Sequence, residues 1–131
     1  MKKLSSIIFA LLFTCTVTLK ITNIQTSDGT IVISIHDSDV SFSKRIPLET
    51  LHLNPESPYI TYTLDLPDGE YAFCVFHDTN NDNDLNSNRL GIPKEPFGFS
   101  HYDGKSPPGN FKKHKVTITE NTIVEIPLVQ F

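Results

Sequence analysis

A long segment at residues 78–110, rich in oxygen-bearing side chains, separates two stretches of alternating apolar residues. In its first half, such side chains recur at every second position. The candidate metal ligands are Asp78, Asn80, Asp82, Asp84 and Asn86. Calcium takes about six to eight oxygen ligands, and known calcium loops place ligands at the first, third and fifth positions. This spacing predicts a loop that is ordered by Ca²⁺.

The predicted calcium loop differs from an EF-hand. An EF-hand would place Gly at the sixth position and Glu at the twelfth, where this chain has Asn83 and Arg89. The closing carboxylate is instead expected from Glu95 or Asp103. Asn and Asp are also common turn residues, so a solvated loop without a metal is the competing interpretation.

A hydrolase is the alternative function. His77 or His101 would act as general base, Asp78 or Asp84 would orient it, and Ser100 would be the nucleophile. No nucleophile elbow or metal-hydrolase motif surrounds these residues, and no His or Cys pair has the spacing of a Zn²⁺ site. We therefore favour a non-catalytic module and assign no catalytic residue.

The second half of the segment mixes aromatic and polar side chains. The residues predicted to form a ligand or partner surface are Lys94, Glu95, Phe97, Phe99, His101 and Tyr102. Such a mixture could bind a glycan or a protein of the cell envelope. Two other interpretations stay open: the rings pack beneath the loop as a small satellite core, or the loop only covers a sheet edge.

Strands must position this segment, because apolar residues alternate with period two from Leu19 onward. The predicted strands lie around residues 19–21, 31–35, 60–66, 71–76, 116–118 and 124–128, with turns at residues 27–29, 67–69 and 120–121. The strand at residues 71–76 is apolar on both faces, so we expect it centrally, with Cys74 as a buried hydrophobe. Pro127 indicates an edge. Residues 37–58 are predicted to be a connection with one short strand near Phe42.

These short strands and turns predict an all-β fold, an antiparallel β-sandwich of immunoglobulin-like or transthyretin-like type with one long Asp/Asn-rich loop. The 131 residues leave room for a single domain. The chain has 11 Lys and Arg residues against 15 Asp and Glu residues, and it shows no basic stripe. Nucleic acid is therefore not an expected partner.

The N-terminus has the pattern of an export signal. Lys2 and Lys3 precede an unbroken apolar run at residues 7–13. This run is shorter than the about 20 residues that span a bilayer, so no transmembrane segment is expected in the mature chain. The competing interpretation makes the run a first strand of the mature fold. We expect a periplasmic or secreted protein.

Cleavage by signal peptidase is expected after Thr16 or Thr18. The predicted organisation is a signal peptide at residues 1–18 and one domain at residues 19–131. Lipidation at Cys15 is not favoured, because Thr14 precedes this cysteine where a lipoprotein signal usually has Gly, Ala or Ser.

Three runs give the chain a specific resemblance. They are Pro-Asp-Gly-Glu-Tyr-Ala at residues 67–72, Phe-His-Asp-Thr-Asn at 76–80 and Gly-Ile-Pro-Lys-Glu-Pro-Phe-Gly-Phe-Ser at 91–100. They resemble the bacterial family of exported proteins known as DUF2141, and the resemblance covers most of residues 19–128. It implies a periplasmic or secreted β-sandwich of unknown biochemical role.

The chain departs from this family in the calcium loop. The family's loop usually reads His-Asp-x-Asn-Gly-Asn-Gly-x-Leu-Asp, whereas this chain has Asn81, Asp82, Asn83 and Asn86 at the corresponding places. Two glycines and one carboxylate are lost. Asp82 adds a carboxylate where the family has an amide.

Overall fold

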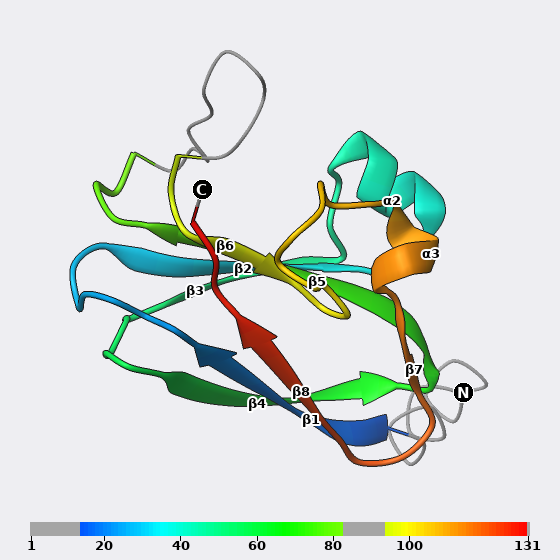
Figure 1. Cartoon of the computed structure of the whole chain (residues 1–131). Coiled ribbons are helices and arrows are strands. Elements are labelled where there is room, and N and C mark those ends of the chain that lie inside the picture. Colours follow the sequence, from blue (N-terminus) through cyan, green and yellow to red (C-terminus); the bar gives the residue numbers. More distant parts are fainter. Residues whose placement is uncertain (1–13, 83–93, 131) are drawn as a thin grey trace.

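The computed structural model describes residues 14–82 and 94–130, and it confirms an all-β fold of two packed sheets (Figure 1). The strands are β1 (Thr14–Thr22), β2 (Thr30–His36), β3 (Glu49–Leu53), β4 (Ile60–Pro67), β5 (Gly69–Asp78), β6 (Phe97–Phe99), β7 (Val116–Ile118) and β8 (Thr122–Pro127). Two short helices are α2 (Asp39–Lys44) and α3 (Phe111–His114). Within the described ranges, no helix has the length and apolar character needed to cross a membrane.

One sheet has the order β4-β1-β8, and the other has the order β3-β2-β5-β6 with β7 also paired to β5. All pairs are antiparallel except β1 with β8, which run parallel. The predicted central strand is confirmed, because β5 pairs with β2, β6 and β7 and is buried on both faces. Strand β8 ends its sheet, as Pro127 indicated.

The main core lies between the two sheets. In β1 every second residue is buried, and in β8 the buried residues also alternate. The buried core residues on these two strands and on β2 and β5 include Val17, Leu19, Ile21, Ile31, Ile33, Ile35, Phe73, Val75, Val124 and Ile126. Alternating burial is what a strand with one face on a core requires.

Strand β1 begins at Thr14, five residues before the first predicted strand residue, Leu19. Cys15 and Val17 are 7% and 0% exposed, and both belong to the main core. The expected end of the signal peptide, after Thr16 or Thr18, therefore falls inside a strand that pairs with β4 from Thr14 to Ile21.

The secondary structure predicted for residues 37–58 was wrong, since this segment contains a helix and a strand at other positions. Phe42 lies in helix α2, not in a strand, because Ser38 caps the helix by accepting a hydrogen bond from the Ser41 amide and Arg45 ends it in the left-handed conformation. The missed strand β3 follows the helix and pairs with β2.

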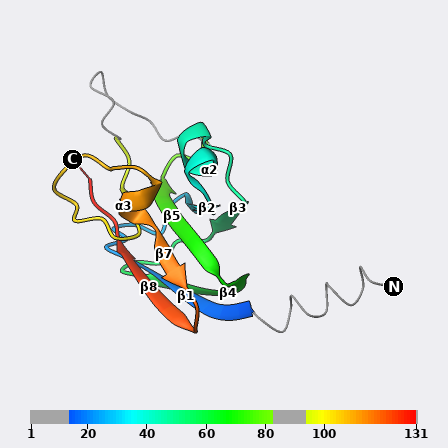
Figure 2. The same cartoon turned by 90° about the vertical axis from the view of Figure 1, so that its right-hand side faces the viewer.

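Both helices cover the outer face of the sheet that contains β5 (Figure 2). Between this sheet and the helices lies a second, aromatic cluster. Its members are His36, Phe42, Phe97, Phe99, Tyr102, Phe111 and His114. The long predicted loop is thus tied to the fold by β6 and by α3, which contribute four of these rings.

Candidate functional site

Three carboxylates meet where β5 ends. Asp78 is the last residue of β5 and is 1% exposed, Glu95 is 6% exposed, and Asp82 is exposed. One carboxylate oxygen from each lies within 4.8 Å of the others. The structure therefore brings together two of the predicted metal ligands and one of the two residues expected to close the site.

Local hydrogen bonds shape the first part of the loop. The Asp82 amide donates to the Asp78 carboxylate over 3.1 Å and to the Asn80 side-chain oxygen over 3.3 Å. Asn81 takes a positive φ of 56°, which Asn tolerates better than most residues. Its side-chain oxygen accepts a bond of 2.6 Å from the Thr30 hydroxyl. The turn is thus closed by hydrogen bonding to the Asp78 carboxylate.

Strand β6 delivers Glu95 to this turn. Phe97 pairs with Phe76, and the His77 amide donates to the Pro96 carbonyl over 2.8 Å. This pairing places the Glu95 carboxylate beside Thr79, whose amide donates to it over 3.0 Å. The pairing of the three-residue strand β6 with β5 therefore places Glu95 next to the loop.

The separation of the carboxylates suits one bound cation. Ca²⁺ holds its oxygens at about 2.3–2.6 Å, so two ligands of one ion lie at most about 5 Å apart. The oxygens of Asp78, Asp82 and Glu95 fall within that limit. Two further predicted ligands, Asp84 and Asn86, lie outside the described residues.

Asp103, the other candidate for closing the site, is engaged elsewhere. Its carboxylate accepts bonds from the amides of Lys105 and Ser106, over 2.9 and 3.2 Å. These backbone bonds lower the pKa of Asp103 below its ordinary value. Asp103 thus stabilises its own turn.

The turn between β1 and β2 packs against the end of β5, next to the three carboxylates. His77 is fully buried, and its Nε2 lies 2.6 Å from the Asp28 carbonyl, so Nε2 carries the proton and donates. Gly29 has a φ of 75°, and a Cβ there would lie 2.0 Å from the Asp78 carbonyl oxygen. The sequence identified this turn from Ser-Asp-Gly, but its contact with the carboxylate loop depends on the β2–β5 register, which the sequence does not show.

The predicted ligand or partner surface is divided in the structure. Lys94 and His101 are exposed, Phe99 and Tyr102 are half-buried, and Glu95 and Phe97 are buried. Phe97 contacts Phe99 and Tyr102 with ring centroids 6.0 and 5.8 Å apart. The rings pack on one another beneath α3 as a satellite core, so an outer ligand would reach chiefly the polar members of the set.

Ser100 fastens this satellite core to β5. Its hydroxyl accepts a 3.0 Å bond from the Phe73 amide and donates a 2.5 Å bond to the His114 carbonyl, and Ser100 is fully buried. His77 lies four residues beyond Phe73 on β5, which is about 13 Å along the strand. The Ser100 hydroxyl is therefore not placed beside His77, one of the two bases that the hydrolase alternative offers. The other, His101, follows Ser100 in the chain and is exposed.

Cys74 was predicted to be a buried hydrophobe, and in β5 it is half-buried. Burial raises the pKa of its thiol to about 12. A reactive cysteine needs a lowered pKa, because the thiolate is the nucleophile.

Two buried histidines make the satellite core sensitive to acid. The His114 Nε2 accepts a bond of 2.9 Å from the Gly109 amide and its Nδ1 donates to the Ser100 carbonyl, so the ring is held neutral. Burial lowers the pKa of both His114 and His36 below their ordinary value of 6.5. Hydrogen bonding to Ser100 partly opposes the effect of burial on the pKa of His114, and the charge of Lys113 adds to it. For His36, Ser41 and Asp37 both oppose the effect of burial on the pKa.

We expect stability to fall as the pH falls below about 6.5. The unfolded chain then takes up protons that the folded histidines bind only at lower pH, so unfolding is favoured until the folded pKa values are passed. The measurement is the urea midpoint between pH 7.5 and pH 5. His114→Gln should flatten this dependence, and His52→Gln, at an exposed position, should leave it unchanged. A wild-type midpoint that is constant over this range would contradict the prediction.

Comparison with known proteins gives one match. The family model described as "Uncharacterized protein conserved in bacteria (DUF2141)" matches residues 19–125. No curated protein and no solved structure matches the chain. The matched residues contain β5, β6 and the three carboxylates at their ends. The chain therefore belongs to the bacterial family DUF2141.

Proposed function

We propose that this chain is an exported, non-catalytic binding module of the bacterial cell envelope and that Ca²⁺ orders its loop after β5. The observation that carries the proposal is the meeting of Asp78, Asp82 and Glu95 within 4.8 Å. Binding residues usually lie on loops that a rigid scaffold holds, and here the scaffold is a two-sheet sandwich. The unbroken apolar run near the N-terminus supports export.

The chemistry of the three side chains favours calcium over other ions. All are hard oxygen ligands, which suit Ca²⁺ and Mg²⁺ better than softer metals. Two of the three are buried at the ends of β5 and β6, so the distance between them is set by strand pairing. Ca²⁺ accepts irregular geometry, whereas Mg²⁺ demands a near-ideal octahedron at shorter distances. A mixed strand-and-loop site therefore suits calcium.

We expect Ca²⁺ to raise the thermal unfolding midpoint of the domain. At 100 times its dissociation constant, a ligand that binds only the folded state adds about 2.7 kcal/mol, or roughly 10 °C for a domain of this size. The midpoint should be measured in chelator and then across titrations of Ca²⁺ and Mg²⁺. Calcium should give the larger rise.

Three variants localise the effect. Asp82→Asn and Glu95→Gln should remove most of the rise, because each takes one charge from the site and keeps an oxygen in place. Glu56→Gln removes a charge from an exposed position in the β3–β4 loop and should keep the full rise. A wild-type midpoint that does not move up to millimolar Ca²⁺ would remove the metal from the proposal.

A further inference from the structure

The two lateral edges of the sandwich differ in whether hydrogen bonds connect the two sheets. On one side, Phe97 of β6 and Val129, which follows β8, exchange two backbone hydrogen bonds of 2.9 and 2.8 Å. These bonds join the two sheets. On the other side lie β3 and β4, and among the described residues each pairs with one strand only, β3 with β2 and β4 with β1. We call the gap between these two free edges the β3–β4 seam.

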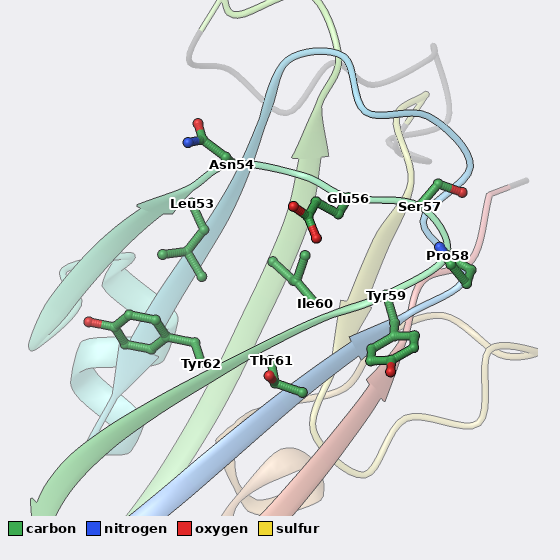
Figure 3. A pocket seen from close by; sticks show the side chains of 9 residues that line it. All are labelled: Leu53, Asn54, Glu56, Ser57, Pro58, Tyr59, Ile60, Thr61 and Tyr62. Carbon is green, nitrogen blue, oxygen red and sulfur yellow. The ribbon is translucent and has the colours of Figure 1, made fainter.

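The core is incompletely covered at this seam. The partly buried hydrophobic residues that pack against the main core are Leu51, Leu53, Ile60 and Leu64, and all four come from β3 or β4. Leu53 and Ile60 point toward each other between the strands, as Figure 3 shows. A groove of about 560 Å³ lies at this end of the seam and is lined by both residues and by Tyr62. Apolar surface therefore remains for a further chain to cover.

Strand β4 also lacks the features that usually protect an edge. Natural edge strands carry Lys, Pro or bulges that prevent pairing with another chain. Between Pro58 and Pro67, β4 has neither Lys nor Pro, and its outward residues are Thr61, Thr63 and Asp65. Its backbone edge is thus available to another strand.

The charges around the seam define the chemistry of that strand. From Pro47 to Pro67 the chain has no Lys or Arg, but it has Glu49, Glu56 and Asp65, all exposed. One cation lies beside these residues on β1, where the Lys20 ammonium is 4.9 Å from the centre of the Tyr59 ring. The seam is acidic, and a second copy of the chain would bring the same acidic residues to it.

We propose that the β3–β4 seam binds an extended peptide segment of a partner, in which apolar and basic residues alternate. The segment adds to the free edge of β4 by backbone hydrogen bonds, as in known cases of strand addition. Its apolar side chains cover Leu53 and Ile60, and its basic side chains face Asp65 and Glu56. Opposite charges on neighbouring strands stabilise the pair, which fixes both register and partner type.

The test uses two synthetic peptides of the same length as β4, one of alternating Val and Lys and one of alternating Val and Glu. Binding is measured by titration calorimetry, and the contact surface is mapped by backbone amide shifts in nuclear magnetic resonance spectra. The experiments are done in chelator, so that the result does not depend on the proposed calcium loop. We expect the Lys peptide to bind at least tenfold more tightly than the Glu peptide, with shifts in β3 and β4.

Two double variants decide whether the seam is responsible. Glu56→Lys with Asp65→Lys should reverse the preference, so that the Glu peptide binds more tightly. Glu120→Lys with Glu125→Lys makes the same change of net charge at exposed positions near and on β8 and should keep the preference for the Lys peptide. Equal responses of the two variants would attribute binding to net charge and overturn the proposal.

Two further outcomes would also overturn it. Shifts centred on the Asp78 loop would show that the peptide binds to the carboxylates and not to the seam. A concentration-dependent doubling of mass, with the shifts of β4 appearing in the absence of peptide, would show that the occupant is a second copy of the chain.

Discussion

A chain that begins at Thr14 is expected to be more stable than one that begins at Leu19 by at least about 3 kcal/mol. The shorter chain lacks Cys15 and Val17, and burying one apolar side chain of this size contributes roughly 1.5–3 kcal/mol. It also loses the part of the β1–β4 ladder that runs from Thr14 to Thr18. Urea unfolding of the two purified chains measures the difference.

Val17→Ala in the longer chain is the control for this experiment. It keeps the backbone ladder and removes only buried methyl groups, so it should reproduce about 1–2 kcal/mol of the loss. Equal stability of the chains from Thr14 and Leu19 would show that the first half of β1 is dispensable. It would also make cleavage after Thr18 compatible with the fold.

The same strand bears on lipidation. The Cys15 thiol lies 3.2 Å from the Asp68 carboxylate and is buried at the start of β1. An acyl chain on this sulfur would have to leave that position. We expect mass spectrometry of the protein purified from its native host to find its N-terminus at or before Thr14 and to find no lipid on Cys15.

The sequence could not separate the predicted export signal from β1 for a physical reason. Thr14, Thr16 and Thr18 look like the polar region that ends a signal peptide. In the structure they are the outward residues of a strand whose inward residues are buried. A polar residue at every second place satisfies both patterns, and only the partner strand β4 distinguishes them.

The strands with alternating apolar residues were predictable, including the three-residue β7, but β3 and the helix α2 were not. β2, β4 and β5 have long apolar patterns, which alternate in β4 and are continuous in the central strand β5. β3 has only Leu51 and Leu53, and α2 is too short to show a helical period. The cap at Ser38 followed by Asp39 was the available signal for the helix.

Two of the three carboxylates of the candidate site, Asp78 and Asp82, were predictable from the sequence, and the third was not. The spacing of Asp78 and Asp82 follows from the chemistry of calcium loops, since both lie in one continuous segment. The sequence could not choose between Glu95 and Asp103, because the choice depends on where β6 pairs with β5. That pairing involves three residues and leaves no periodic signal.

The structure also predicts that Gly29→Ala will be destabilising by about 3 kcal/mol and will weaken the calcium response. A Cβ at this position would lie 2.0 Å from the Asp78 carbonyl oxygen and 2.7 Å from the Thr79 Cα, and both are backbone atoms that cannot rotate away. The residue would also have to keep a φ of 75°, which disfavours every residue with a Cβ. The urea midpoint in chelator measures the first effect, and the calcium titration measures the second.

Gly69→Ala is the matched control, since it makes the same chemical change at the first residue of β5. A Cβ there would lie 3.4 Å from the Tyr71 ring, an ordinary contact distance, so we expect a change within about 1 kcal/mol and an unaltered calcium response. If Gly29→Ala lowered stability but kept the full calcium response, the turn at Gly29 would support the fold and not the site. The β5 terminus would then hold its carboxylates without help from the turn between β1 and β2, and strand pairing with β6 alone would set the distance between Asp78 and Glu95.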